Sequence, residues 1–329
     1  MRLFKRYPDL DVLAKEIQAD IRNRDLPFLP IKEKIIWDAG SCKERKIGIQ
    51  DIRNQIYDYI AVRGMAEIIP RKGLYQCASI KTRGQLYGLR AIQKWLRADP
   101  KGTKYVLKCD IRKFYPSVSH EKLLGFLNKR IKNDDLLWLI EEILKSFGPQ
   151  GLSIGSYLSQ TMANLYLSDL YHFIEEDCAI YKTRRGVTRR YKLCTHTLFY
   201  MDDILCFGAN KTNMKKLAVL IGEKLTEMGL ELKAEPQVYP MDDDAVVDML
   251  GFKIYRSRTA IRKRNWKRIR RSLIRYDRMP KNEIHAKKIA SYWGFIKHTN
   301  SCVIRHDYKA HKLFNRARKQ LSQMAKPDG

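Results

Sequence analysis

The sequence is poor in acidic residues for the number of basic residues that it contains, and this imbalance limits its partners. It has 64 Lys and Arg against 36 Asp and Glu, which gives a formal net charge of +28. A positive field of this size attracts polyanions. We therefore expect nucleic acid as the main partner. An anionic membrane and a structural role in a ribosome-like particle are the alternatives.

The sequence also lacks long apolar runs. None approaches the roughly 18 residues that a membrane-spanning helix requires, and no signal peptide opens the chain. We therefore expect a cytoplasmic protein with no membrane partner. Repeats and low-complexity tracts are absent as well, and 44% of the 329 residues are hydrophobic. A chain of this length and composition is expected to fold into two or three packed subdomains.

The cysteines are too scattered for a zinc ribbon or a disulfide framework. No two of them form a C-x-x-C pair, and their number is odd. Zinc ribbons need paired cysteines, and disulfide frameworks need an even set. We therefore expect free, mostly buried thiols. The seven residues are Cys42, Cys77, Cys109, Cys178, Cys194, Cys206 and Cys302.

Apolar residues at helical spacing predict several amphipathic helices. Ser119 is a suitable N-cap for one of them. The helices are expected over residues 8–24, the second half of 43–60, 120–131, 136–147, 156–174 and 213–229.

Strands are indicated where β-branched and aromatic residues cluster. We expect them from residue 105, in 195–200 and 204–208, and as a single strand in 248–257. Pro116 is expected to stop the element that starts at residue 105, and residues 181–193 to form a polar, basic connection. This mixed order predicts an α+β fold with an antiparallel sheet that helices cover on one face.

The stretch LFYMDDILCF, residues 198–207, places Asp202 and Asp203 inside an apolar run. Burying two adjacent anions costs several kcal/mol unless a positive charge lies against them. Asp110 is expected at the end of a neighbouring strand, so three carboxylates would converge on two Mg²⁺ ions about 3.5–4 Å apart. The chemistry implied is in-line phosphoryl transfer. The alternative is an ordinary polar turn, as we expect for MDDDA at 241–245.

These motifs resemble those of reverse transcriptases. FYMDDILCF resembles the family's tyrosine-any-aspartate-aspartate motif, and CDIRKFYPSV resembles its aspartate motif. GLSIGSYLSQTMANLYL, GLELKAEP and DMLGFKI follow in the family's order. The resemblance implies a right-hand polymerase fold with an antiparallel, split βαβ, ferredoxin-like palm. The expected domains are an N-terminal helix and fingers in 1–103, a palm in 104–256 that includes fingers helices at about 120–150, and a short, basic, helical thumb in 257–329.

The thumb expectation has compositional support, because residues 253–329 contain 23 Lys and Arg against four Asp and Glu. Aromatic residues lie among these charges, a pattern suited to gripping a sugar-phosphate backbone. The alternative is a solvated pair of basic helices. The printed chain has no room after this region for an RNase H, integrase or endonuclease domain, so we expect template removal to come from elsewhere.

The resemblance also implies roles for single residues. Asp110 and Asp202 would be the main ligands of two Mg²⁺ ions, which Mn²⁺ would be able to replace, with Asp203 close by and the Ile111 carbonyl as a further oxygen. Tyr115 would exclude a ribose 2′-hydroxyl, unless it is an ordinary core tyrosine. The expected nucleotide-binding residues are Arg45, Lys46, Arg112, Lys113, Phe114, Tyr115, Ile154, Gly155, Gln160 and Lys233. The expected nucleic-acid-binding residues are Tyr200, Met201, Gly251, Lys263, Arg264 and Lys267.

Two of these residues have further interpretations. Lys233 would protonate the leaving pyrophosphate, with an ordinary surface lysine as the alternative. Arg45, with the neighbouring lysine, would clamp the triphosphate or the template.

Two segments resemble the reverse transcriptases of diversity-generating retroelements. They are SIGSYLSQ at 153–160 and SYWGFIKHTNS at 291–301. That resemblance implies copying of a template RNA into cDNA with errors opposite adenines, dNTPs and an RNA/DNA duplex as partners, and a small basic accessory protein. Ile154 stands where most relatives have glutamine. Losing that hydrogen-bonding group would lower base discrimination by roughly 1–3 kcal/mol, unless Ile154 only anchors the loop.

Other readings stay open beside this one. The chain would alternatively be a reverse transcriptase of the retron, group II intron or phage-defence type. A catalytically idle RNA-binding scaffold is a third reading, although such a scaffold has no reason to retain three costly carboxylates.

Overall fold

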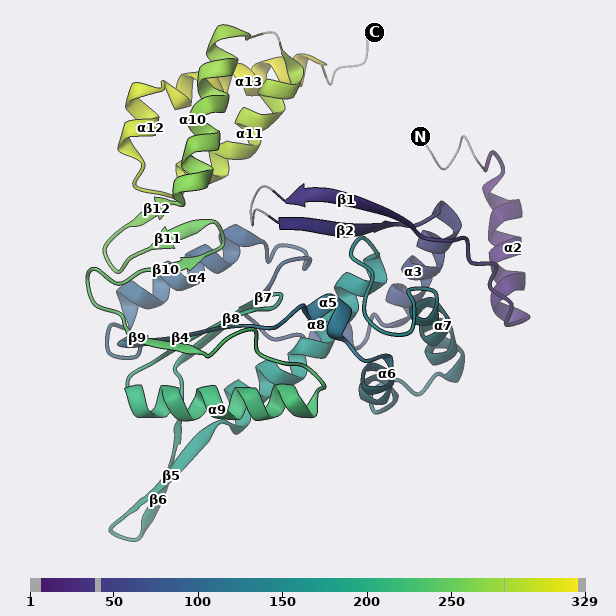
Figure 1. Cartoon of the computed structure of the whole chain (residues 1–329), viewed down its shortest axis with the longest axis horizontal. Helices are drawn as coiled ribbons and strands as arrows, with labels where there is room; N and C mark the ends of the chain where they lie inside the picture. The colour runs from purple at the N-terminus through teal and green to yellow at the C-terminus, as the bar shows by residue number, and fades with distance from the viewer. Residues whose placement is uncertain (1–6, 39–42, 281, 325–329) are drawn as a thin grey trace.

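The computed structural model describes residues 7–38, 43–280 and 282–324. Its centre is a five-stranded sheet of order β3-β7-β8-β4-β9, in which all neighbours are antiparallel except β3 and β7 (Figure 1). The predicted strand from residue 105 and the two strands around residues 201–202 are confirmed. The five strands are β3 (Gln76–Cys77), β4 (Tyr105–Asp110), β7 (His196–Tyr200), β8 (Asp203–Gly208) and β9 (Gln237–Pro240).

Both faces of this sheet are covered, so the prediction of helices on one face is wrong. Leu107 of β4 packs with α8 (Tyr157–His172) and α9 (Lys211–Glu227), whereas the adjacent Val106 packs with α4 (Gln85–Ala98). The strand is apolar on both sides, and each side therefore needs a cover.

A second sheet shares the α4 face. It consists of β10 (Val247–Met249), β11 (Phe252–Ile254) and β12 (Thr259–Ile261). The single strand predicted in 248–257 is wrong, because Leu250 and Gly251 have positive φ values of 58° and 79° and reverse the chain. The sequence LG therefore marks a turn between two short strands.

The N-terminal half supplies a group of helices and a hairpin beside the central sheet (Figure 1). The predicted helices are confirmed, and the Ser119 hydroxyl accepts from the Lys122 amide at 3.3 Å as an N-cap. Pro116 lies inside a short helix and does not stop the strand, which already ends at Asp110. The elements are α2 (Leu10–Arg22), β1 (Lys32–Asp38), β2 (Lys43–Ile49), α3 (Ile52–Gly64), η1 (Ile69–Arg71), α5 (Phe114–Ser117), α6 (His120–Asn128) and α7 (Asp134–Lys145).

Residues 181–193 do not form an irregular connection. The chain leaves α8 through η2 (Phe173–Asp177) and forms the antiparallel ribbon β5 (Ala179–Arg184) and β6 (Val187–Lys192), which projects from the body of the protein (Figure 1). Arg185 and Gly186 turn the ribbon at positive φ values of 51° and 77°. The polar composition concealed these strands because neither side of the ribbon is buried in a core.

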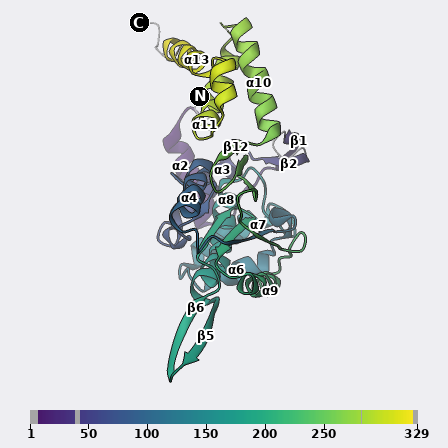
Figure 2. The same ribbon diagram turned by 90° about the vertical axis from the view of Figure 1, so that its left-hand side faces the viewer.

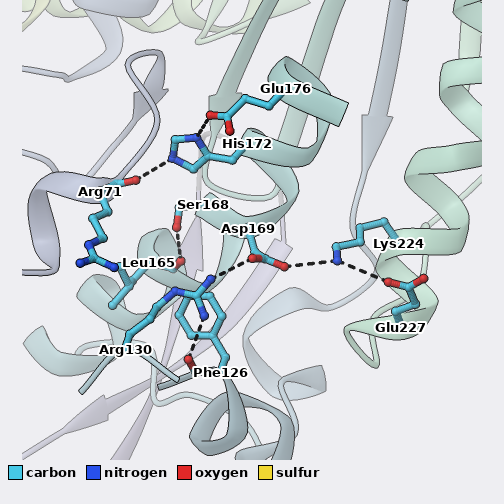
Figure 3. Close-up of polar contacts among 10 residues, drawn as sticks. All are labelled: Arg71, Phe126, Arg130, Leu165, Ser168, Asp169, His172, Glu176, Lys224 and Glu227. Carbon is cyan, nitrogen blue, oxygen red and sulfur yellow. Dashed lines mark hydrogen bonds and ion pairs between the residues drawn. The ribbon is translucent and has the colours of Figure 1, made fainter. Parts of the chain in front are cut away.

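A polar network joins three helices behind the central sheet (Figure 3). The Asp169 carboxylate on α8 accepts from the Arg130 guanidinium at 3.0 Å and pairs with the Lys224 ammonium of α9 at 3.3 Å. Arg130, just after α6, also donates to the Phe126 carbonyl at 2.9 Å. The network therefore fixes α6 and α9 against the long helix that carries the residues after Gly155.

The C-terminal helices form a bundle with its own core, and this bundle lies at one end of the molecule (Figures 1 and 2). It contains α10 (Lys263–Arg278), α11 (Glu283–Lys297), α12 (Cys302–Asp307) and α13 (Ala310–Met324). In the described part of the chain no helix is long and apolar enough to cross a membrane. The described cysteines are free, as predicted, while Cys42 lies outside the described residues.

Candidate active site

The central sheet brings the three predicted carboxylates together. Asp110 ends β4 and pairs in register with Asp203, which begins β8. The Ile111 amide donates to the Asp202 carbonyl at 3.3 Å. Between the strands, Met201 turns the chain with a positive φ of 53°. Residues more than ninety positions apart in the sequence therefore lie on adjacent strands.

The two adjacent carboxylates are in an unfavourable environment for charge. Burial, together with the charges of Asp203 and Asp110, raises the pKa of Asp202 to about 6. Burial also raises the pKa of Asp203, although Lys108 and other cations oppose it. Within the described residues, neither side chain forms an ion pair or accepts a hydrogen bond from another residue. A cation placed here would lower the free energy of both charges.

Lys233 lies directly against the first carboxylate. Its ammonium donates to Asp110 Oδ2, and its backbone amide donates to the Asp110 carbonyl at 2.9 Å. The hydrogen bond to Asp110 raises the pKa of Lys233. A bridge between Ile111 and Leu232 holds this lysine segment beside β4. The structure thus places the predicted proton donor at the predicted metal ligand.

The three carboxylates are not arranged as a complete set of metal ligands. Among residues 7–38, 43–280 and 282–324, no group of three or more His, Cys, Asp or Glu side chains is arranged to hold a metal ion. Asp110 is paired with Lys233 instead. The donor set nevertheless suits Mg²⁺, which prefers a few carboxylates completed by substrate oxygens. Asp202 and Asp203 fit this requirement because no cation in the described part of the chain pairs with either.

The segment after Asp110 leads into the site. Arg112 and Lys113 are exposed, and Arg112 pairs with Glu231 at 3.3 Å, whereas Phe114 is buried. Tyr115 is half-buried, and burial and the Asp202 charge raise its pKa to about 12 while Arg45 opposes this rise. The tyrosine hydroxyl therefore stays protonated at neutral pH beside the carboxylates.

A cleft of about 640 Å³ opens beside Asp203, between the β1–β2 hairpin, the β7–β8 turn and helices α10 and α11. It is lined by four of the predicted residues, namely Arg45, Tyr200, Asp203 and Gly251. Nine further lining residues were not among the predicted site residues: Ile36, Trp37, Gln85, Leu250, Arg262, Asn265, Arg268, Tyr292 and Phe295. Those at the start of α10 recur at every third position. This spacing would have identified them if it had been known which side of α10 faces the cleft.

The predicted basic residues of α10 lie elsewhere on that helix. Lys263, Arg264 and Lys267 are exposed and do not line the cleft. Basic residues cover most of α10 outside its apolar side, which Ile269, Leu273 and Tyr276 form. Composition alone could therefore not show which of the basic residues face the cleft.

Gly251 is required by close packing at the cleft wall. Its φ is +79°, and a Cβ there would lie 2.9 Å from Asn265 Nδ2 and 3.0 Å from Phe295 Cε1. Asn265 donates to the Gly251 carbonyl at 3.2 Å. The residue therefore fixes the β10–β11 turn against α10 and α11.

The Ile154–Gly155 loop contacts the β1–β2 hairpin. The Gly48 amide donates to the Ile154 carbonyl at 2.7 Å. Gly155 has a φ of +121°, and a Cβ there would lie 2.4 Å from the Gly48 carbonyl oxygen. Gln160 is half-buried in the first turns of α8. Lys46, next to Arg45 on β2, pairs with Glu33 at 3.2 Å and does not line the cleft.

Asp58 positions this loop, and sequence reasoning missed it. The side chain is fully buried on α3 and accepts from the Ser156 hydroxyl at 2.6 Å. It also accepts from the amides of Tyr157 and Leu158 at 3.1 and 3.3 Å. The carboxylate therefore stabilises the N-terminus of α8 from a neighbouring helix. A single acidic residue within a helix gives no spacing signal that could have revealed this.

Comparison with protein families matches residues 46–254 to the family described as "Reverse transcriptase (RNA-dependent DNA polymerase)". Among curated proteins, the chain is 26% identical over 223 residues to a Schizosaccharomyces pombe protein named "Uncharacterized 91 kDa protein in cob intron". That match covers 64% of this chain and 27% of the relative. The chain thus spans about a quarter of the length of the curated relative that it matches.

Three solved structures have a partly similar arrangement. Apo telomerase from Candida tropicalis is 12% identical with a TM-score of 0.49, covering 91% of this chain and 59% of that one. Its form truncated from the C-terminal domain is 15% identical with a TM-score of 0.45, covering 69% and 53%. Telomerase from Candida albicans in complex with a fragment of telomeric RNA is 13% identical with a TM-score of 0.44, covering 70% and 44%.

Proposed function

This chain belongs to the reverse transcriptase (RNA-dependent DNA polymerase) family, and we propose that it copies a template RNA into cDNA with Asp110, Asp202 and Asp203 as its catalytic carboxylates. The fold is that of a polymerase, with the central sheet as the palm and the C-terminal bundle as the thumb. The domain borders expected at residues 103 and 256 stay predictions. The observation that carries the proposal is the pairing of Asp110 with Asp203 beside an Asp202 that forms no ion pair with any residue the structure describes.

Two Mg²⁺ ions would be held by these carboxylates, with the Ile111 carbonyl as a further ligand. When bound, they would activate the primer hydroxyl and stabilise the charge of the leaving pyrophosphate. Asp110 becomes available only when the Lys233 ammonium leaves it, and that ammonium is then free to donate a proton to the pyrophosphate. Tyr115 would lie against the sugar of the incoming dNTP, and Arg45 would bind its phosphates.

The cleft supplies the place for the primer-template duplex. Arg268 gives it positive charge on the α10 side, where Arg262 pairs with Asp248, and Tyr292 and Phe295 of α11 give it aromatic surface. Charges of this kind bind phosphates without reading sequence, and rings support the sugars and bases. The RNA/DNA duplex would therefore lie between palm and thumb.

The test is primer extension. The purified chain is incubated with Mg²⁺, a DNA primer annealed to RNA and all four dNTPs, and DNA products are resolved by length. Extension that requires Mg²⁺ and disappears in Asp110→Asn supports the proposal. Undiminished extension by that variant would refute the assigned carboxylates, and no extension by the native chain on any primed RNA would refute the activity.

Within the family, we infer the diversity-generating type from the segments at 153–160 and 291–301. Ile154 offers its backbone carbonyl to Gly48, and its side chain has no hydrogen-bonding group for a base. The enzyme would then misincorporate opposite template adenines, assisted by a small basic accessory protein. Sequencing cDNA from the native chain and from Ile154→Gln tests this. Substitutions concentrated at adenines, and fewer of them in the variant, are the expected result.

A second candidate follows from the curated relative, whose name places it in a cob intron. On that reading the chain is a reverse transcriptase of the intron-associated type. It would copy RNA with errors spread evenly over the four template bases. The same sequencing experiment separates the two types, since only the first predicts a bias toward adenines.

A further inference from the structure

The β5–β6 ribbon has a composition that neither packing nor the polymerase site explains. Residues 179–192 contain six Lys and Arg and no Asp or Glu. The ribbon projects from the palm at the end opposite the thumb helices in both views (Figures 1 and 2). A duplex held between palm and thumb would therefore not account for these charges.

One face of the ribbon gathers the cations of its outer part. Lys182 lies directly opposite Arg189 in the register, and Arg184 is the next residue on the same face. Cations opposite each other on adjacent strands repel. Within the described residues none of these three forms an ion pair with an acid. An anion bound along this face would relieve the repulsion.

The ribbon also exposes aromatic rings. Tyr181 is 69% exposed and Tyr191 is 45% exposed. The Lys182 ammonium lies 5.8 Å from the centre of the Tyr191 ring, on the cationic face. Exposed rings interleaved with cations bind single-stranded nucleic acid, because bases stack on the rings while the cations bind phosphates.

The base of the ribbon is held firmly, which makes the ribbon an arm of defined direction. Lys192 pairs with Glu175 at 3.2 Å, and the Arg190 guanidinium donates to the Glu176 carbonyl. The Glu176 carboxylate contacts His172 Nδ1 at 2.7 Å, and His172 Nε2 contacts the Arg71 carbonyl at 2.7 Å (Figure 3). The inner cations thus serve attachment, and the outer ones are left for a ligand.

Protection of strand edges is the other use of such charges. Lys residues on exposed strands discourage pairing with other chains. That role requires only a few charges and no aromatic partners. The ribbon has basic residues along both strands, and an isolated two-stranded ribbon gains little stability from its own packing. A ligand explains the composition more completely.

We propose that the β5–β6 ribbon is a second RNA-binding element that holds a single-stranded segment of RNA outside the catalytic cleft. This goes beyond the proposed function and rests on it only in taking the bound RNA to be the template. Because the deep, narrow groove of double-stranded RNA excludes side chains, stacking on Tyr191 selects single strands.

The test compares two triple variants by fluorescence anisotropy with a labelled, unstructured RNA oligonucleotide. Lys182→Ala/Arg184→Ala/Arg189→Ala removes the cationic face. Lys211→Ala/Lys215→Ala/Lys216→Ala removes three exposed cations from α9 and is the charge-matched control. At about 0.15 M salt the ribbon variant should bind about 10- to 50-fold more weakly, and its slope against log salt should fall by about 2. The control should retain most of the native affinity.

Two further measurements test whether the ligand is single-stranded RNA and whether the variants stay folded and active. Tyr191→Ala should weaken binding of the single strand and leave binding of double-stranded RNA unchanged. All variants should extend a primed duplex with a minimal overhang at the native rate and melt at the native temperature, because the changed side chains are outside the core.

Equal losses in the two triple variants would overturn the proposal. The proposal would also be overturned if the ribbon variant lost binding to anionic vesicles but kept its RNA affinity. The same holds if it lost affinity equally for double-stranded DNA and for the single-stranded RNA. Failure of the native chain to extend any primer would refute the proposed function alone, since ribbon-dependent RNA binding is measured in the same preparation without dNTPs.

Discussion

Asp58 and Asp202 are both buried carboxylates, but they differ in the hydrogen-bond donors and charges around them. Asp58 receives a hydroxyl and two backbone amides from the start of α8. Among the described residues Asp202 has no such donors other than itself, and its neighbours Asp203 and Asp110 add repulsion to the effect of burial. A buried charge with internal partners supports the fold. One without them would be stabilised by a cation that binds from outside, which makes it a candidate for a functional site.

The largest expected effect is on catalysis. Asp202→Asn/Asp203→Asn should lower the extension rate at least about 1,000-fold, because both carboxylates are assigned to the metal ions. The free energy of unfolding, measured by urea denaturation, should stay the same or rise, because two repelling charges disappear. A loss of unfolding free energy as large as the one expected for Asp58→Ala would contradict the different roles assigned to the two carboxylates.

Asp58→Ala should have the opposite profile. The Ser156 hydroxyl and two amides lose their acceptor in the interior, which should cost about 2–4 kcal/mol of unfolding free energy. Urea denaturation measures this directly, with Asp58→Asn as the conservative control that retains an acceptor. Native stability in Asp58→Ala would contradict the structural role.

Tyr115 extends the comparison to an uncharged side chain near Asp202, whose charge contributes to the raised pKa of the tyrosine. Tyr115→Val should relax discrimination against ribonucleotides by about 10- to 100-fold, since the bulk that opposes a 2′-hydroxyl is removed. Single-nucleotide incorporation of a dNTP and its rNTP gives the ratio. Tyr115→Phe, which keeps the ring, should preserve it, and loss of discrimination in that variant would contradict a steric cause.

Glu176 extends the comparison to the surface, where a carboxylate pairs with His172 at 2.7 Å. Burial lowers the pKa of His172, but the Arg71 carbonyl and Glu176 outweigh it, so the pKa is raised. The stabilisation is therefore present below the unfolded pKa of about 6.5 and is lost as pH rises through the folded value. Thermal melts of the native chain and His172→Gln should differ by less than about 1 kcal/mol in acid and converge at alkaline pH. A difference that grows with pH would contradict this.

Sequence reasoning located the strands that carry Asp202 and Asp203 because their signals are local. Apolar residues on both sides of β7 and β8, and two aspartates at the turn between them, can be read without knowing the rest of the fold. The order of the motifs then brought in Asp110 from a distant segment.

The rest depended on tertiary contacts. The β5–β6 ribbon has no buried side, so it lacks the alternation that marks a strand. The part of α10 that faces the cleft could not be chosen, since basic residues cover most of the helix outside the apolar side formed by Ile269, Leu273 and Tyr276. Asp58 owes its role to Ser156 and its neighbours, about a hundred residues away, and nothing near it in the sequence indicates this.

The hydrogen bond from the Gly48 amide to the Ile154 carbonyl ties the base of the β1–β2 hairpin to the Ile154–Gly155 loop. The space at Gly155 is too small for any side chain, so the backbones of Gly48 and Gly155 pack directly against each other. Any displacement of the base of the β1–β2 hairpin would therefore move the Ile154–Gly155 loop with it, so the positions of the hairpin and of the start of α8 are coupled.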